Sequence, residues 1–147
     1  MAKERTLGLR ERMFEFACEV VQFCRRLSKE PGVVRQIAWQ LADAATSASA
    51  NIEEAKSAYS RRDFAAKNSI SLKEMRESLY WLRVIRRCDL APRVEVDPLL
   101  DEADQLTAML TAGMRRLNPL LVALLVLALA FLVLRLVPQF QVVQFKF

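Results

Sequence analysis

The chain of 147 residues carries a net charge of +5, and hydrophobic residues make up 53% of it. Glycine and proline are scarce, which argues against a turn-rich β fold, whereas the length suits one domain of four helices. The lack of histidine excludes a Ser-His-Asp triad, a Cys/His zinc site and the Glu-x-x-His di-iron site of some helix bundles. We therefore expect no enzymatic activity, no metal and no cofactor.

The three cysteines are Cys18, Cys24 and Cys88, and they form no C-x-x-C pair. An odd number of cysteines without an N-terminal signal peptide is typical of reduced, mostly buried thiols in the cytoplasm. The positive charge suits a nucleic acid or an anionic membrane as partner, and a merely soluble surface explains it as well.

Two helices are predicted in the first part of the chain, over residues 9–28 and 34–58. The first has apolar side chains at alternating spacings of four and three residues, and Pro31-Gly32 ends it. These apolar residues are Leu9, Met13, Phe16, Val20, Phe23 and Leu27. The second keeps the helical period from Ile37 to Tyr59, and its middle is rich in alanine and serine. Because small side chains let a neighbouring backbone approach closely, we expect this helix to lie deep in an assembly.

A third helix is predicted from Ser60 to Cys88, because Ser60-Arg61-Arg62-Asp63 has the form of a capping box. Its predicted core stripe is Phe64, Asn68, Leu72, Met75, Leu79 and Leu82. The fourth helix is predicted to begin at Asp97-Pro98, an N-cap followed by proline. Short connections make sequential helices antiparallel neighbours, so residues 1–117 are predicted to form an all-α, antiparallel up-down four-helix bundle.

The third predicted helix also carries the charge of the chain. Residues 61–88 hold eight basic and three acidic side chains, an excess of five that equals the net charge. Five of its residues share a second stripe, spaced three and four residues apart. This predicted nucleic-acid-binding ridge consists of Lys73, Arg76, Tyr80, Arg83 and Arg87. A basic ridge with one aromatic ring suits a phosphate backbone and a stacked base. The alternative is an ordinary solvated face whose arginines pair with Glu53, Glu54 or the acidic fourth helix.

Trp81 lies about 140° from the centre of the core stripe, near Ile70 and Ile85. An apolar strip outside the main seam indicates an oligomer interface formed by Ile70, Trp81 and Ile85. The alternative is that the bundle buries the third helix on both sides.

Adjacent Glu53 and Glu54 diverge by about 100° on a helix, so they do not form an acid–base pair facing one substrate. We expect no catalytic residue here; these carboxylates are expected to cap a neighbouring helix or to form an ion pair with Arg61, Arg62 or Lys67.

The last part of the chain is strongly hydrophobic. No charged residue lies between Arg116 and Arg135, a stretch of 18 residues, and a membrane-spanning helix needs roughly 17 to 25. Residues 118–138 are therefore predicted to form a hydrophobic helix that spans a membrane through residues 119–137. Arg115 and Arg116 on its N-terminal flank place the bundle in the cytoplasm, tethered to the inner membrane. The alternatives are a soluble cytoplasmic protein with a buried oligomerisation helix, or a tail not native to the domain.

The closing residues 139–147 roughly alternate between polar and apolar side chains. They are predicted to form a short tail, either a strand or an unstructured end.

Several motifs resemble the bacterial four helix bundle proteins encoded in intervening sequences of 23S rRNA genes, to which the accessory variability proteins of diversity-generating retroelements are related. The resemblance covers residues 9–117 and is carried by residues 47–55, 60–64, 69–74 and 79–83. Its most specific part is the S-x-x-A-N-I-x-E block followed by S-R-x-D-F.

The resemblance implies an antiparallel bundle that assembles into a ring-like homopentamer. For the retroelement relatives, it implies a basic surface that binds RNA or DNA and a partner reverse transcriptase. It brings no catalytic residues. We therefore expect a non-enzymatic, oligomeric nucleic-acid-binding or scaffold protein that acts through the third helix, and the alternative is a membrane-anchored oligomeric adaptor that binds proteins.

Overall fold

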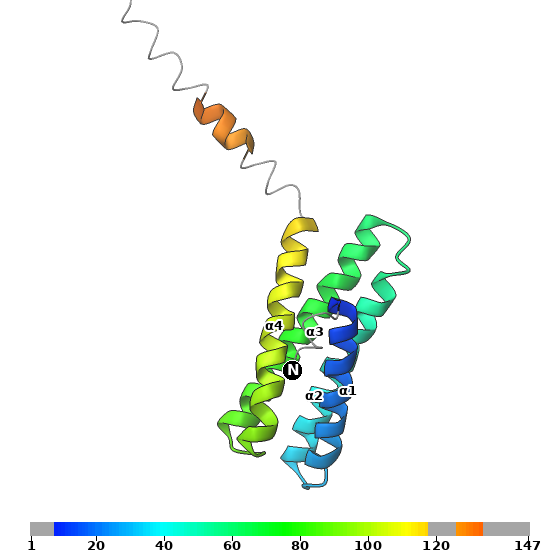
Figure 1. The fold of residues 1–147 in the computed structure, drawn as a ribbon, viewed down its shortest axis with the longest axis vertical. Coiled ribbons are helices and arrows are strands. Elements are labelled where there is room, and N and C mark those ends of the chain that lie inside the picture. Colours follow the sequence, from blue (N-terminus) through cyan, green and yellow to red (C-terminus); the bar gives the residue numbers. More distant parts are fainter. Residues whose placement is uncertain (1–7, 118–125, 134–147) are drawn as a thin grey trace, which may run out of the picture. The chain divides into compact units, whose positions relative to one another are not determined.

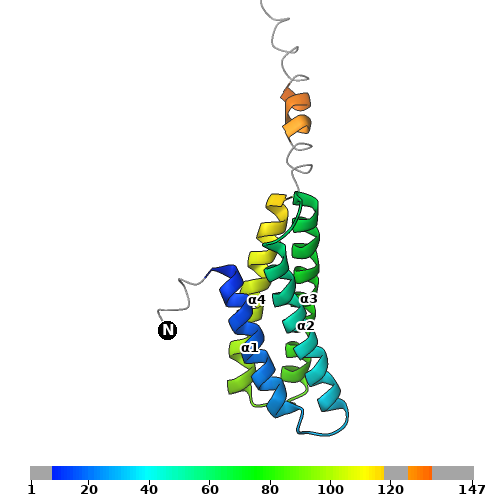
Figure 2. The same cartoon turned by 90° about the vertical axis from the view of Figure 1, so that its right-hand side faces the viewer.

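The computed structural model describes residues 8–117 and 126–133. Residues 8–117 contain four helices: α1 (Leu9–Leu27), α2 (Val33–Ala55), α3 (Arg61–Arg87) and α4 (Arg93–Leu117). Each helix runs antiparallel to the one before it, and the four lie side by side (Figures 1 and 2). No strand occurs in the described parts of the chain. The prediction of an all-α helical bundle is therefore confirmed.

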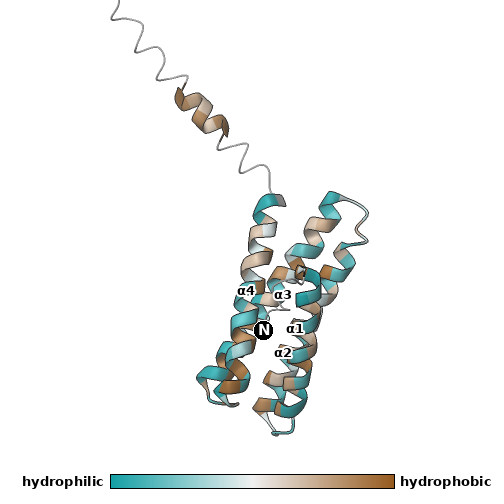
Figure 3. Cartoon of the chain, viewed as in Figure 1, coloured by the Kyte–Doolittle hydropathy of each residue, from teal (hydrophilic) through white to brown (hydrophobic). Residues whose placement is uncertain are grey.

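All four helices contribute to one hydrophobic core. Every member of the predicted apolar stripe on α1 except Leu9 is buried, and α4 adds Leu99, Ala103, Leu106 and Leu110. Hydrophobic and hydrophilic residues alternate along each helix of the bundle, as amphipathic helices require (Figure 3). The three-and-four spacing that predicted α1 therefore describes the side that α1 buries.

The small residues of α2 pack against α3. Ala45, Ala48, Ser71 and Ser78 are all fully buried, and the hydroxyl of Ser71 donates a hydrogen bond to the carbonyl oxygen of Ala48 at 2.8 Å. The close neighbour expected for these small side chains is therefore α3 of the same chain. Ser71 and Ser78 lie seven residues apart, so both lie on the same side of α3.

The predicted cap at the start of α3 is confirmed. The amide of Asp63 donates to the hydroxyl oxygen of Ser60 at 3.1 Å. The carboxylate of Asp63 accepts from the amide of Tyr59 at 3.2 Å, rather than from Ser60 as in the usual capping box. The preceding helix, α2, ends at Ala55, three residues earlier than predicted, and Tyr59 is fully exposed.

The start of α4 was predicted wrongly. The helix begins at Arg93, and Pro98 lies inside it. The carboxylate of Asp97 lies 2.8 Å from the Nε of Arg86 on α3, in an ion contact rather than an aligned hydrogen bond, so it does not cap a helix. Val96 is fully buried, and its amide donates to the carbonyl oxygen of Pro92. Burial of Val96 and the contact with Arg86 therefore extend the helix towards its N-terminus, past the local start signal at Asp97-Pro98.

The core stripe of α3 also differs from the prediction. Leu72, Met75 and Leu82 are buried as expected, whereas Phe64 is exposed and Asn68 is half-buried. Ser71, Ser78 and Ile85 are fully buried in addition to the predicted residues. The buried side of α3 is therefore rotated towards Ser71, which bonds to α2, and towards Ser78 and Ile85.

The chain divides into two compact units, residues 1–114 and 115–147. In the second unit, residues 126–133 form a helix, and its hydrophobic character is visible in Figure 3. Its eight side chains are all apolar and exposed. Within the described residues, no helix combines the length and the apolar composition that crossing a membrane requires. The rest of the predicted span, 118–138, and the predicted tail, 139–147, lie outside the described residues.

Candidate nucleic-acid interface

The basic ridge predicted on α3 is exposed along its whole length. Lys73, Arg76, Arg83 and Arg87 are exposed, and so is Tyr80, with 56% of its surface accessible. From Lys73 to Arg87 the ridge covers fourteen helical steps, or about 21 Å. That length matches roughly six nucleotides of a stacked strand at 3.4 Å each.

The acidic side chains that offered an alternative explanation contact other residues. Glu54 pairs with Lys67, Glu53 lies 3.5 Å from Arg10, and Asp97 contacts Arg86. The hydrogen bond from Lys67 to Glu54 raises the pKa of the Lys67 ammonium group. The predicted pairing of Glu54 with Lys67 is thereby confirmed.

Among the described residues, no ion pair involves any of the four basic ridge residues. Their charges are therefore not neutralised by the carboxylates of α2 or α4 that the solvated-face alternative required. An unpaired, exposed line of positive charge is what an electrostatic contact with a polyanion needs.

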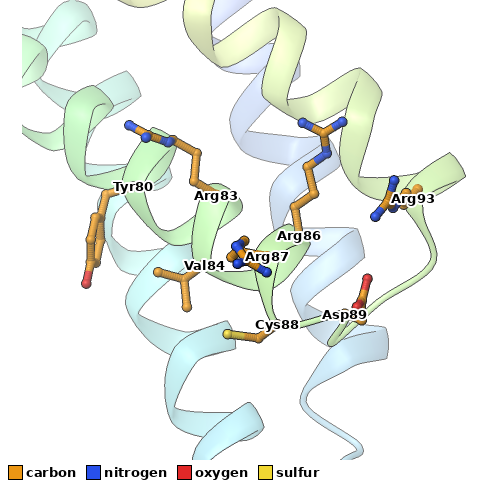
Figure 4. Close-up of a pocket in the computed structure, with 8 residues that line it drawn as sticks. All are labelled: Tyr80, Arg83, Val84, Arg86, Arg87, Cys88, Asp89 and Arg93. Atoms are coloured by element: carbon orange, nitrogen blue, oxygen red, sulfur yellow. The ribbon is translucent and has the colours of Figure 1, made fainter.

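At its C-terminal end the ridge opens into a hollow between the end of α3 and the start of α4 (Figure 4). The hollow has a volume of about 840 Å³. Its lining residues are Tyr80, Arg83, Val84, Arg86, Arg87, Cys88, Asp89 and Arg93. Below, we call this feature the arginine hollow. It combines three ridge residues with Arg86 and Arg93, which lie outside the ridge predicted from the sequence.

The turn after α3 shapes the arginine hollow. The amide of Leu90 donates to the carbonyl oxygen of Ile85 at 3.0 Å, and the amide of Asp89 donates to that of Arg86 at 3.4 Å. These two bonds, with a φ of 50° at Asp89, form a Schellman motif. The motif turns the chain sharply, so that Arg93 in the first turn of α4 lies across the hollow from α3.

The aromatic ring of the ridge is held in place by its neighbour. The ring centroids of Tyr80 and Trp81 are 5.0 Å apart and their planes are inclined by 69°, an edge-to-face contact. Trp81 is half-buried against the core, and its indole N–H donates to the carboxylate of Glu77 at 3.3 Å. Trp81 therefore supports Tyr80 from the side.

The predicted oligomer interface on α3 needs a correction at Ile85. This side chain is fully buried in the core of its own chain, so a partner subunit does not reach it. For Ile85 the alternative interpretation holds, because the bundle itself buries this side of α3. Ile70 is 43% exposed and Trp81 is half-buried, and an interface formed by these two residues stays a prediction.

A second exposed apolar surface was not predicted. Phe14, Cys18 and Val21 of α1, at spacings of four and three residues, line a groove of about 510 Å³ with Ser49 and Ala50 of α2. Phe14 is 55% exposed and Val21 is 43% exposed. Their spacing was visible in the sequence, but the stripe beside it, with Met13 and Phe16, gave a stronger signal for the core.

No group of three or more cysteine and carboxylate side chains in the described part of the chain is placed to hold a metal ion. Burial raises the pKa of the Cys24 thiol to about 12, so this thiol stays protonated near neutral pH. Of the three thiols, Cys24 is buried as expected and Cys18 is half-buried, whereas Cys88 in the arginine hollow is exposed, so the expectation of buried thiols is wrong for Cys88.

The fold and this site define a small all-α bundle protein with an unpaired basic face on one helix. The chain belongs to the 23S rRNA-intervening sequence protein family, whose family model matches residues 5–112. This confirms the resemblance proposed from the sequence motifs. The hydrophobic stretch that follows α4 lies beyond the matched residues.

A solved structure supports the same assignment. It is a protein of unknown function from the S23 ribosomal protein family of Bacteroides thetaiotaomicron, which is 29% identical to this chain with a TM-score of 0.67. The match covers 73% of this chain and 98% of that protein. No protein with a curated description is significantly similar to the chain.

Proposed function

We propose that the protein is a non-enzymatic nucleic-acid-binding scaffold that acts through the basic ridge on α3. The observation that carries the proposal is the line of four exposed basic side chains without ion-pair partners among the described residues. Each such side chain that meets a phosphate releases condensed counterions, which favours binding and makes it sensitive to salt. Tyr80 in the middle of the line adds a surface on which a base stacks.

The charge of the ridge sets the size of the salt effect. If all four basic side chains meet phosphates of a single strand, the affinity falls about 50-fold between 50 and 200 mM salt. The measurement is the affinity of the full chain for a labelled 12-nucleotide strand, by fluorescence anisotropy over this range. An affinity that does not change with salt would contradict the proposal.

Charge reversal separates the contribution of the ridge to binding from the contribution of the protein's overall positive charge. The test variant carries glutamate at Lys73, Arg76, Arg83 and Arg87. The control variant carries glutamate at four exposed basic residues outside the ridge, namely Arg25, Lys29, Lys56 and Arg62. Both variants lose eight charge units, so we expect binding to be lost only in the first. Equal binding by the two variants would rule out the ridge, and circular dichroism checks that both are folded.

The absence of enzymatic activity is part of the proposal. The two adjacent carboxylates of α2 that could have suggested acid–base chemistry are each engaged, Glu53 with Arg10 and Glu54 with Lys67. Their contacts support a structural role that joins α2 to α1 and α3.

Self-association is also part of the proposal, and the resemblance implies a homopentamer. The exposed apolar surface of Phe14, Cys18 and Val21 supports association better than the predicted interface, which loses Ile85 to the core. Native mass measurement of the full chain in detergent, compared with a Val21→Glu variant, tests this. A monomer in the unmodified chain would refute it.

The second candidate function is a membrane-anchored adaptor, favoured by the apolar, exposed helix of residues 126–133 within a stretch without charges. Fractionation of cells that express the full chain tests it. Recovery of the chain in the soluble fraction, without detergent or aggregation, would eliminate this candidate.

The resemblance also suggests a reverse transcriptase as partner. A neighbouring reverse transcriptase gene with a repeat pair would support that role, and a position inside an rRNA gene would support the intervening-sequence role.

A further inference from the structure

The arginine hollow has a composition that differs from the rest of the ridge. Four arginines line it, against a single carboxylate, that of Asp89. Its volume of about 840 Å³ falls in the usual range of small-molecule sites, about 300 to 1,000 Å³. In Figure 4, Tyr80 and Arg83 lie on one side of Arg87, and Arg86 and Arg93 lie on the other. The hollow is therefore large enough for one nucleotide and positive on both sides.

A purely structural role explains only part of this cluster. Basic side chains in the last turn of a helix offset the negative end of its dipole, which accounts for Arg86 and Arg87. Arg86 also contacts Asp97, which fixes its position. Arg83 lies before that last turn and Arg93 belongs to α4, so the dipole of α3 explains neither.

The chemistry of these side chains fits a phosphate group. Guanidinium groups bind phosphate oxygens through two parallel N–H donors, and they stay charged at every physiological pH. No ion pair among the described residues occupies Arg83, Arg87 or Arg93. Three arginines without ion-pair partners therefore line one hollow, and each offers donors to a phosphate.

Tyr80 adds a selective element at the rim. Its edge-to-face contact with Trp81 covers at most one face of the ring, so the other face is not stacked on Trp81. A base stacks on such a face only when it is not held inside a duplex, because duplex bases are covered by their neighbours. The hydrogen bond and core contacts of Trp81 hold the pair, so Tyr80 is oriented before any ligand binds.

We propose that the arginine hollow binds one nucleotide of a single-stranded nucleic acid, with its phosphate among the arginines and its base stacked on Tyr80. This inference rests on the proposed function of the ridge and names its ligand class. It follows that the protein prefers single strands to duplexes of the same sequence, although both meet the same positive ridge.

Two substitutions in the hollow, each with a matched control, test this inference. Tyr80→Ala removes the stacking surface, and Tyr59→Ala removes the other tyrosine of the chain, which is fully exposed before α3. Arg93→Gln removes an arginine of the hollow that is not part of the ridge, and Arg62→Gln is its control on an exposed position. Affinities of the full-length variants are measured by anisotropy with a 12-nucleotide strand and its duplex, as DNA and as RNA.

We expect Tyr80→Ala to weaken single-strand binding roughly 5- to 150-fold, which is the usual contribution of one stacked base, and to leave duplex binding unchanged. Tyr80→Trp retains a stacking surface and should keep the preference for single strands. Arg93→Gln should weaken single-strand binding several-fold, and the two control variants should bind as the unmodified chain does. If Tyr59→Ala lowers the single-strand affinity as much as Tyr80→Ala does, or if Tyr80→Ala does not lower it, the inference is overturned.

The cysteines provide an independent measurement that needs no substitution. Cys88 lines the arginine hollow and is exposed, whereas Cys18 lies in the apolar groove between α1 and α2. A bound strand should slow the alkylation of Cys88 by iodoacetamide and leave that of Cys18 unchanged, as read by mass spectrometry. Binding of the strand without protection of Cys88 would place it elsewhere and refute the inference.

Failure of this inference differs from failure of the proposed function. If the full chain binds no nucleic acid at low salt, the ridge proposal is wrong and the hollow inference is wrong with it. If it binds strands and duplexes equally, with the salt dependence of the ridge but no effect of Tyr80→Ala, only the hollow inference is wrong.

Discussion

Replacement of Ser71 by leucine tests whether small side chains let α2 and α3 pack closely. Ser71 is fully buried, and its hydroxyl lies 2.8 Å from the carbonyl oxygen of Ala48. A larger side chain must push the two helices apart, which typically costs about 1–3 kcal/mol. The lost hydrogen bond adds about 0.5–1.5 kcal/mol. We therefore expect Ser71→Leu to lower the free energy of unfolding by roughly 2–4 kcal/mol.

Two further variants separate volume from hydrogen bonding. Ser71→Ala removes the hydroxyl without adding volume, and the carbonyl of Ala48 keeps its helical acceptor role in α2. We expect a cost of about 0.5–1.5 kcal/mol, the contribution of the hydrogen bond alone. Ser69→Leu makes the same replacement at an exposed position two residues away on α3 and should stay within about 0.5 kcal/mol of the unmodified chain.

The assay is urea and thermal unfolding of the full chain, followed by circular dichroism at 222 nm. A loss of 2–4 kcal/mol corresponds to a fall in Tm of roughly 8–15 °C for a domain of this size. The slope of the unfolding free energy against urea should not change, since the unfolded state exposes the same surface. If Ser71→Leu is as stable as Ser69→Leu, the close packing of α2 on α3 is wrong.

Three further predictions concern other contacts of the bundle. Arg12 donates two hydrogen bonds to Glu102, at 2.9 and 2.7 Å, and these bonds join α1 to α4. A double-mutant cycle with Arg12→Gln and Glu102→Gln should give a coupling of about 1–2 kcal/mol in the free energy of unfolding. A coupling near zero would contradict the contact. Burial raises the pKa of Cys24 from 9.0 to about 12. The folded state thus keeps a proton that the unfolded state loses, so the free energy of unfolding should fall between about pH 9 and 12, by up to roughly 4 kcal/mol. The free energy is measured by urea titration at each pH. If it falls with pH as steeply in Cys24→Ala as in the unmodified chain, the prediction is refuted. Pro98 lies inside α4 and has no backbone N–H to donate to the carbonyl of Val94. Pro98→Ala should therefore raise the free energy of unfolding by about 1–3 kcal/mol. A lower Tm for this variant would contradict the prediction and show that the proline stabilises the start of the helix.

The sequence predicted those parts of the fold that depend on local patterns. The apolar spacing on α1 and the serine cap at Ser60 are short-range signals, and both appear in the structure as predicted. The start of α4 failed because it depends on contacts between helices. Asp97 and Pro98 have the form of a helix start, but burial of Val96 and the contact of Asp97 with Arg86 outweigh that local preference.

Hydropathy alone also misplaced the buried side of α3. Ser71 and Ser78 were left out of the predicted core because serine is polar, although a small hydroxyl that bonds to a backbone carbonyl is readily buried. With these two serines facing inward, Ile85 falls on the same side and is buried as well. An apolar strip outside the core was therefore predicted where part of the core lies.

The candidate site was likewise predicted only in the part that depends on a local pattern. The helical period was enough to place Lys73, Arg76, Tyr80, Arg83 and Arg87 on one face, since all five belong to one helix. The sequence pattern did not predict the arginine hollow, because the hollow depends on the left-handed turn at Asp89 and on an arginine of the next helix. Asparagine and glycine are the usual residues at such a turn, so an aspartate there gave little warning of it.

The buried face of α3 holds the basic ridge in position. The residues that anchor α3 in the core alternate along the helix with those of the ridge: Met75 precedes Arg76, and Leu82 precedes Arg83. A basic side chain beside a fully buried anchor has a fixed backbone, so less conformational entropy is lost when it meets a phosphate. The close packing of α2 on Ser71 extends this rigidity along the helix. In the proposed function, the bundle is therefore the support that keeps the ridge straight.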